Sequence, residues 1–261
     1  MQIPFVKAHG AGNDFLLTWD GDSAFTPDLA RAICHRHTGA GADGWMLVTR
    51  QPPAIRLLNS DGSEAELSGN GTRCAAALLV REGLVGPDFH IQTGAGPKHL
   101  RLISRAGLSF LFEMNMGTPR VLASAFQLPL AAGPQEVTLL DVGNPQCVVR
   151  VDSFDFDWRA MGAEIERHAH FANRTNVSFV KRVDDHSIDV RFYERGAGET
   201  MSSGTGSTGA AAAALHHALV SSPVSVLTPA GPLQLRQAGD ALYLTGPAVV
   251  IADGIFHYDE L

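Results

Sequence analysis

The sequence predicts an α+β fold made of two structurally related halves. The first observation is an internal repeat, because a shift of 135 positions aligns residues 56–77 with residues 191–212. The second is that short apolar runs of β-favouring residues outnumber helix-like segments. The third is that each half holds one Ala-rich stretch of good helix formers, at 74–80 and at 210–219.

The repeat includes a strand, a polar loop and a helix in each half. The shift places Arg-Leu-Leu-Asn at 56–59 on Arg-Phe-Tyr-Glu at 191–194, and Ser-Gly-Asn-Gly at 68–71 on Ser-Gly-Thr-Gly at 203–206. A second offset, of 131 positions, lays Gly12-Asn13 over Gly143-Asn144. We therefore expect halves at residues 1–117 and 118–261, with the last strand free to return to the first half.

The remaining elements follow from local patterns. Two further helices are predicted, at 28–37 behind Pro27 and at 157–168. Strands are predicted at 45–49, 55–59, 89–93, 108–114, 146–151, 177–180, 188–193, 224–228, 232–236 and 241–245.

Composition and charge exclude several classes of protein. Apolar residues make up 45% and charged residues 18%, which argues against disorder and coiled coil. The net charge of −7 argues against nucleic-acid binding. No run is apolar enough for a membrane helix, and the first residues lack the pattern of a secretory signal. The three cysteines form no CxxC motif, so we expect reduced thiols, no zinc site and a cytoplasmic location.

The two Gly-containing loops each stand at a predicted helix N-terminus. The first N–H groups of a helix lack intrahelical partners and carry partial positive charge, so a carboxylate is a natural ligand there. The alternative is that Ser68 and Ser203 are N-caps and the glycines only form turns. A duplicated pair favours the ligand. With an amino-acid carboxylate bound between the two helix ends, the serines would flank its α-carbon in a two-base arrangement.

These residues resemble the diaminopimelate epimerase family, a cofactor-independent branch of the proline-racemase and phenazine-biosynthesis-like superfamily. The matching segments span about 200 residues in the family's order. They are residues 10–15, 59–66, 69–74, 143–145, 194–200 and 204–206, and the late segment 245–248 also looks familial.

The resemblance implies two halves, each a curled, mostly antiparallel sheet around a central helix, with substrate in the cleft between them. It implies inversion of L,L-diaminopimelate to the meso form in lysine biosynthesis, with an amino acid as ligand and no cofactor or metal. The oligomeric state stays open between a monomer and a homodimer, and the charge and the apolar runs predict neither a nucleic-acid nor a membrane partner. Glu194 is expected near the reacting groups. The residues expected to bind substrate are Asn13, Asn59, Gly69, Asn70, Asn144, Asn176, Arg195, Gly204 and Thr205.

The chain departs from the family at the acid–base positions. Ser68 and Ser203 stand where the family has its catalytic cysteines. Gln146 replaces the His that the family usually has after Gly-Asn-Pro, and Gly44 replaces a Gln that the family commonly has near the first loop. Because these positions changed together with the cysteines, natural divergence is favoured over engineered substitution of the cysteines. Cys74 and Cys147 lie beyond the catalytic positions and are expected to be structural.

The departure carries a large acid–base cost. An alcohol is about seven pKa units less acidic than a thiol, which is roughly 10 kcal/mol against forming the base. The serines therefore need a neighbouring base as a relay, and Glu194, Glu66 and His9 are the candidates. Three hypotheses follow: an epimerase using relayed serines, a single-base lyase or dehydratase of a β-hydroxy amino acid, and a non-catalytic amino-acid-binding protein.

Overall fold

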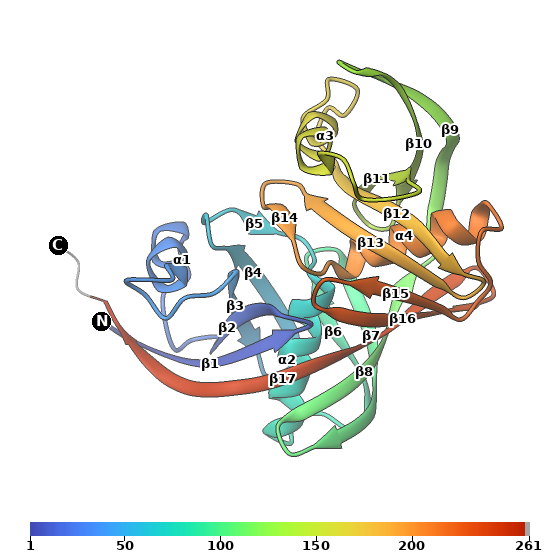
Figure 1. Ribbon diagram of the computed structural model, residues 1–261. Helices are drawn as coiled ribbons and strands as arrows, with labels where there is room; N and C mark the ends of the chain where they lie inside the picture. Colours follow the sequence, from blue (N-terminus) through green and yellow to red (C-terminus); the bar gives the residue numbers. More distant parts are fainter. Residues whose placement is uncertain (259–261) are drawn as a thin grey trace. The chain divides into compact units, whose positions relative to one another are not determined.

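A computed structural model describes residues 1–258, which divide into two compact units (Figure 1). Unit 1 contains Met1–Met114 and the segment that begins at Gly246, and unit 2 contains Asn115–Thr245. The chain leaves unit 1 within strand β8 (Ser109–Gly117) and returns to it within strand β17 (Ala241–His257). The predicted α+β class, with one sheet around a central helix in each half, is confirmed.

Unit 1 is a ring of strands around helix α2 (Gly69–Arg81). Neighbouring strands pair in the order β1, β2, β3, β4, β6, β7, β8, β17 and back to β1, so the ring closes. Residues 69–79 of α2 are all buried, because small side chains let the helix fit inside the ring. The other elements are β1 (Gln2–Gly10), β2 (Asn13–Trp19), α1 (Pro27–Cys34), β3 (Gly44–Thr49), β4 (Ala54–Asn59), β5 (Glu64–Ala65), β6 (Asp88–Thr93) and β7 (Gly96–Ala106).

Unit 2 repeats the same order of elements around helix α4 (Gly204–His216). The strands pair in the order β9, β10, β11, β12, β13, β15, β16 and β17. Parallel pairs occur at matching places: β2–β3 and β4–β6 in unit 1, β11–β12 and β13–β15 in unit 2. The elements are β9 (Arg120–Leu130), β10 (Gly133–Asp141), β11 (Pro145–Arg150), α3 (Trp158–Glu166), β12 (Asn176–Asp184), β13 (Ser187–Glu194), β14 (Gly198–Thr200), β15 (Val224–Thr228) and β16 (Gly231–Ala238).

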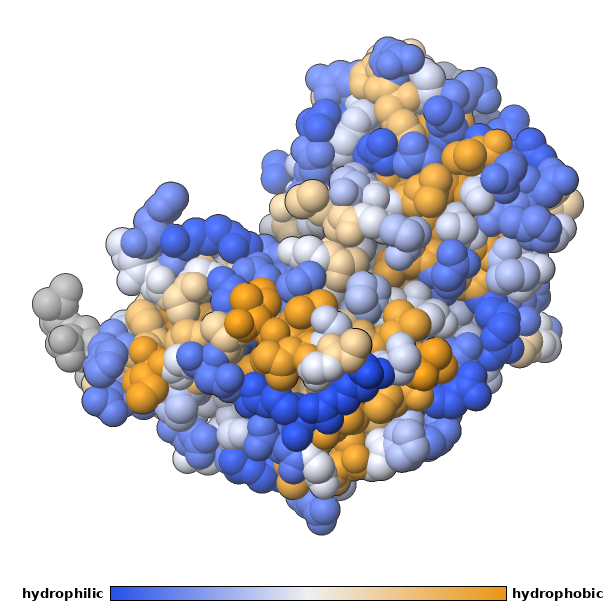
Figure 2. Space-filling model, turned by 60° about the horizontal axis from the view of Figure 1, so that its bottom comes forward, coloured by the Kyte–Doolittle hydropathy of each residue, from blue (hydrophilic) through white to orange (hydrophobic). Residues whose placement is uncertain are grey.

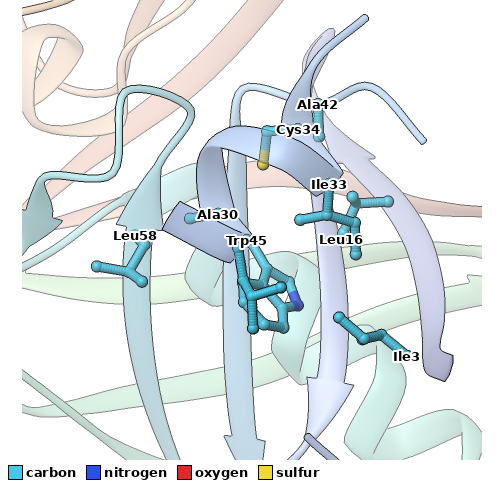
Figure 3. Close-up of a cluster of buried hydrophobic side chains, with 9 residues drawn as sticks. Ile3, Leu16, Ala30, Ile33, Cys34, Ala42, Trp45 and Leu58 are labelled. Carbon is cyan, nitrogen blue, oxygen red and sulfur yellow. The ribbon is translucent and has the colours of Figure 1, made fainter. Parts of the chain in front are cut away.

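Helix α1 covers the outer face of the unit 1 sheet. Thr26 caps its N-terminus by accepting a hydrogen bond from the Leu29 N–H at 3.3 Å, and Pro27 occupies its first turn. Figure 3 shows its Ala30, Ile33 and Cys34 lying over the strands that carry Leu16 and Trp45. The Trp45 indole is fully buried and donates to Thr18 Oγ1 at 2.9 Å, so its polar atom is satisfied.

Two predicted helices are shorter than expected. The first was expected to reach His37 but ends at Cys34, because His35 adopts an extended backbone. Gly39 then returns against the end of the helix, where a Cβ would lie 2.2 Å from the Ala32 carbonyl oxygen. In α3 the expected first residue, Asp157, is the N-cap, and its side chain accepts from the Ala160 N–H at 3.0 Å. The predicted end of this helix, at residue 168, also lies beyond the observed last residue, Glu166.

The sequence prediction missed several strands. Leaving aside the short strands β5 and β14, five strands have no predicted counterpart: β1, β2, β7, β9 and β10. The strand predicted at 241–245 continues to His257, because its second part pairs with β1. Strands β7 and β9 are mostly exposed and rich in charged or small residues, so their apolar alternation is weak.

The outer surface mixes polar and apolar residues. Figure 2 shows apolar residues in groups that polar residues break up. Ile251 and Ile255 of β17 are among the exposed apolar residues, at 52% and 56% exposure. Across residues 1–258, the helices are too short or too polar to span a bilayer.

Candidate active site

The N-terminal turns of α2 and α4 have the same local geometry. Ser68 and Ser203 are the N-caps, in extended backbone, and their hydroxyl oxygens accept from Gly71 N–H at 3.1 Å and Gly206 N–H at 3.0 Å. Both serines thus have the N-cap geometry that the alternative interpretation expected, and ligand binding at these helix ends stays a prediction. A cap takes up only one of the first-turn amides, so the N–H groups of Gly69 and Gly204 have no intrahelical acceptor.

Close packing makes glycine necessary in each of these turns. A Cβ on Gly71 would lie 1.9 Å from Met46 Cε, and a Cβ on Gly206 would lie 2.8 Å from Phe192 Cδ1. Each glycine therefore presses its helix end directly onto a side chain of the surrounding sheet. The packing fixes the position of the capping serine, because it is part of the same turn.

In unit 2 the serine has a carboxylate partner. Ser203 Oγ donates to Glu194 Oε2 at 2.7 Å, and Thr200 Oγ1 donates to Glu194 Oε1 at 2.6 Å. Strand β14 pairs with the end of β13, with Glu194 opposite Gly198, which places all three side chains at one end of the hairpin. Ser203 is 3% exposed, so its hydroxyl proton is directed to the carboxylate rather than to solvent.

In unit 1 the corresponding serine lacks such a partner. The position that matches Glu194 is Asn59, whose amide donates to Ser63 Oγ at 3.0 Å. Within residues 1–258, no hydrogen bond joins the Ser68 hydroxyl to a carboxylate, and the other two candidate relays, Glu66 and His9, do not contact it in this way. The two helix ends therefore match in backbone but differ in acid–base chemistry.

The expected asparagines of unit 1 lie at the start of β2, at the end of β4 and in the first turn of α2. Asn13, at the β1–β2 turn, contacts Asn70 of α2, with Asn70 Nδ2 3.4 Å from Asn13 Oδ1. Gly10 permits this approach, since a Cβ there would lie 3.0 Å from the Asn70 carbonyl oxygen. Asn59, at the end of β4, donates to Ser63, and it pairs with Gly44, the residue after the Asp43 that accepts from Asn13.

The expected binding residues of unit 2 are held by one another. Asn144 Nδ2 donates to Thr205 Oγ1 at 3.4 Å, while Asn144 Oδ1 accepts from Gln146 Nε2 at 2.7 Å. Asn176 Oδ1 accepts from the Arg195 backbone N–H at 3.0 Å, which ties the loop after Glu194 to strand β12.

The charge of Arg195 is not neutralised by a carboxylate. Its guanidinium donates to the Asn173 carbonyl oxygen at 3.4 Å, and none of the ion pairs in the described part of the chain includes it. The same loop is anchored by the buried Glu166, which accepts from the Gly196 N–H at 3.2 Å and pairs with Arg174.

The cysteine thiols are poor acid–base groups. Cys34, Cys74 and Cys147 are all buried and unpaired with one another. Burial raises the pKa of Cys34 and of Cys74 to about 12, and it raises the pKa of Cys147 as well. The thiols therefore stay protonated near neutral pH. Among residues 1–258, no cluster of three or more His, Cys, Asp and Glu side chains could hold a metal ion.

Sequence reasoning missed two residues of this region. Thr200 holds the second oxygen of Glu194, and Asp43 accepts a hydrogen bond from Asn13 Nδ2 at 2.6 Å. Thr200 lies in the segment 194–200, which resembles the family. The available signal was a hydroxyl six positions after the carboxylate of Glu194. Asp43 had no local signal, because its partner lies thirty positions earlier in the chain.

Comparison with solved structures places the fold among amino-acid racemases and related proteins. A probable proline racemase from Agrobacterium radiobacter superposes with a TM-score of 0.77 at 17% identity, covering 97% of this chain and 92% of that one. A hydroxyproline epimerase from Agrobacterium vitis, bound to trans-4-hydroxy-L-proline, superposes with a TM-score of 0.75, also at 17% identity and with the same coverage. At this identity the likeness concerns the fold alone.

Sequence comparison is more specific. The family model for diaminopimelate epimerase matches residues 5–122 and 138–251. The diaminopimelate epimerase of Pelotomaculum thermopropionicum is 36% identical, over 97% of this chain and 99% of its own length. That of Archaeoglobus fulgidus is 37% identical, over 100% of this chain and 99% of its own length. The chain belongs to the diaminopimelate epimerase family, as the resemblance of its motifs predicted.

Proposed function

We propose that the chain is a cofactor-independent amino-acid epimerase that inverts diaminopimelate between its L,L and meso forms, a step of lysine biosynthesis. The observation that carries the proposal is the Ser203–Glu194 hydrogen bond of 2.7 Å at the N-terminus of the buried helix α4. Full-length similarity to relatives named diaminopimelate epimerase supports the choice of substrate.

The carboxylate gives Ser203 a way to act as a base. A free serine alkoxide would cost roughly 10 kcal/mol more than a thiolate. In the proposed step Ser203 Oγ takes the proton from the substrate α-carbon while its own proton passes to Glu194 Oε2. No free alkoxide forms, and the negative charge moves from the carboxylate to the substrate enolate. Thr200 keeps the carboxylate oriented through its hydrogen bond to Oε1.

The enolate and the substrate carboxylate need electrostatic stabilisation. We propose that the first-turn amides of the two helices supply it, because they lack intrahelical acceptors and carry the positive end of the helix dipole. Arg195 would bind the distal carboxylate. The proposed substrate contacts are those expected from the resemblance: Asn13, Asn59, Gly69, Asn70, Asn144, Asn176, Arg195, Gly204 and Thr205.

Inversion also needs a group that returns a proton to the other side of the α-carbon. Ser68 is the proposed donor: it gives its hydroxyl proton to the α-carbon and recovers a proton from water, since its hydroxyl has no carboxylate partner among the described residues. Glu194 then releases to solvent the proton that it accepted, which completes the cycle. Proton return through Ser68 is therefore the harder step. We expect it to limit the rate, in contrast to proton removal through the Ser203–Glu194 pair.

This asymmetry favours a second candidate function. A single competent base removes and returns a proton on one face, or eliminates a β-substituent without inversion. The chain would then be a lyase or dehydratase of a β-hydroxy amino acid. The observation that favours it is the contrast between Glu194, beside Ser203, and Asn59, at the matching position of unit 1.

Proton NMR in D₂O separates these functions. L,L- and meso-diaminopimelate are incubated with the wild-type protein and with Ser203→Ala, and the α-hydrogen signals are followed. Loss of the signal with interconversion of the isomers supports the epimerase. Exchange without interconversion, or a keto-acid product from a β-hydroxy amino acid, supports the single-base enzyme. Ligand-induced thermal stabilisation without exchange refutes both and leaves an amino-acid-binding protein.

The location and the partners of the protein are also part of the proposal. The three cysteines are unpaired, which suits a reducing compartment, so we propose a cytoplasmic location, with a small amino acid as the ligand. The net charge of −7 speaks against a nucleic-acid partner. A homodimer stays a prediction that sedimentation of the purified protein would test.

A further inference from the structure

Within unit 1, four side chains form one hydrogen-bonded chain across the β1–β2 turn and the start of α2. Arg73 Nη2 donates to Asn70 Oδ1 at 2.6 Å, and Asn70 Nδ2 donates to Asn13 Oδ1 at 3.4 Å. Asn13 Nδ2 then donates to Asp43 Oδ2 at 2.6 Å. The two amides in the middle are thus linked to a cation at one end and a carboxylate at the other.

The charged ends determine the direction of every hydrogen bond in this chain. A guanidinium can only donate and a carboxylate can only accept, whereas an amide does both. Asn70 must therefore turn its oxygen to Arg73, and Asn13 must turn its nitrogen to Asp43. Flipping either amide would place two donors or two acceptors face to face, so each has a single allowed orientation.

Both ends of the chain are themselves held in place. The Arg73 side chain is fully buried, with Nε donating to the Pro247 carbonyl oxygen at 3.1 Å and Nη1 to that of Gly69 at 3.2 Å. Asp43 accepts from Arg36 Nη2 at 2.6 Å and from the Asp14 backbone N–H at 3.1 Å. Neither end can turn away without losing several contacts.

The matching group in unit 2 lacks this control. Asn144 lies between the amide of Gln146 and the hydroxyl of Thr205, and both of these partners can donate as well as accept. Its orientation is therefore not dictated by charge. The contrast indicates that the charged ends in unit 1 serve the orientation of the amides, since the helix end in unit 2 folds without them.

We propose that Asp43 is a positioning residue, which fixes the side-chain amide of Asn13 in one orientation for substrate binding. The proposal rests on the proposed function, in which Asn13 contacts the amino acid. With one Nδ2 hydrogen held by Asp43, the second hydrogen and one oxygen lone pair of Asn13 remain for the ligand. Asp43 itself need not touch the substrate.

A double-mutant cycle tests the positioning role. Kd for diaminopimelate is measured by calorimetry for wild type, Asp43→Ala, Asn13→Ala and the double variant. Asp43→Ala is chosen because an Asn at this position would keep an oxygen that accepts from Asn13. We expect Asp43→Ala to weaken binding roughly tenfold, and to change it less than about twofold when Asn13 is already Ala, because residues of one network are not additive. An equal loss in both backgrounds would mean a merely structural role and would overturn the proposal. The matched control is Asp28→Ala, which breaks an exposed ion pair with Arg31 and should leave Kd unchanged.

A second measurement needs no ligand. In the ¹⁵N-labelled free protein, the Asn13 side-chain NH₂ signals are identified by their absence in Asn13→Ala. We expect one strongly shifted, slowly exchanging hydrogen in wild type and in Asp28→Ala, and its loss in Asp43→Ala. Unchanged Asn13 signals in Asp43→Ala would refute the positioning role even in an active enzyme. A wild-type protein that neither binds nor exchanges diaminopimelate would refute the proposed function, while these signals still decide the orientation of Asn13.

Discussion

Replacing Glu194 by Gln tests whether the carboxylate beside Ser203 takes part in proton transfer. Gln has nearly the same shape, so its amide oxygen can still accept the Ser203 hydroxyl at the observed 2.7 Å. It cannot take up the proton. Because a positioned general base contributes about 10²–10⁴-fold, we expect the rate of α-proton exchange to fall by that factor, or roughly 2.7–5.4 kcal/mol of activation free energy.

The assay is the rate of deuterium uptake at the α-carbon of diaminopimelate in D₂O. The matched control is Thr200→Val, which removes the hydrogen bond to the other carboxylate oxygen, 2.6 Å away, and leaves the base in place. Loss of one neutral donor to a charged group costs about 1.5–3 kcal/mol at most, so the control should retain more activity than Glu194→Gln. The relay is wrong if Ser203→Ala abolishes exchange while Glu194→Gln leaves its rate unchanged.

Three further predictions concern packing, thiols and pH. Gly206→Ala should lower the unfolding free energy by about 1–3 kcal/mol, because its Cβ would lie 2.8 Å from Phe192, and urea titration should show no such loss for Gly86→Ala, whose Cβ meets nothing within 4 Å. A thiol reagent at pH 8 should leave all three cysteines of the native protein unmodified, because burial raises their pKa values, and should label them in denaturant; rapid labelling of the native protein would contradict the burial. Burial raises the pKa of Asp14, but hydrogen bonds and charges from its Arg and Lys partners outweigh it and hold the pKa below the ordinary value. Its stabilisation is therefore present above about pH 4 and lost as the pH falls through the folded-state pKa, so Asp14→Asn should destabilise the protein at pH 7 and less at pH 3, and an equal loss at both would contradict this.

Local sequence signals indicated that the two serines open helices, but the Ala-rich stretches predicted as helix, 74–80 and 210–219, have other bounds than the observed α2 (Gly69–Arg81) and α4 (Gly204–His216). Ser followed by a Gly-rich turn and an Ala-rich stretch is an N-cap pattern, and both helices begin one residue after their serine. The duplicated order of strand, loop and helix also follows from the sequence, because the repeat is unbroken over that stretch. The weakly alternating strands, such as β7 and β9, could not be found in this way, since tertiary pairing rather than apolar pattern makes them strands.

Residue identity alone determined which groups the chain offers for catalysis. Serines at the two proposed base positions, an asparagine or a glutamate at the matching strand ends, and glycines in the helix turns can all be read from one sequence. Such features depend on neighbours a few residues apart, so local rules suffice to interpret them.

Only the tertiary structure decided how these groups pair. It places Glu194, rather than Glu66 or His9, beside a site serine, and it leaves Ser68 without a carboxylate among residues 1–258. It also joins Asp43 to Asn13 and returns β17 to β1 to close the ring of unit 1. The physical reason is that hydrogen bonds between distant residues depend on strand register and helix placement, which are set by the packing of the whole unit rather than by any short stretch of sequence.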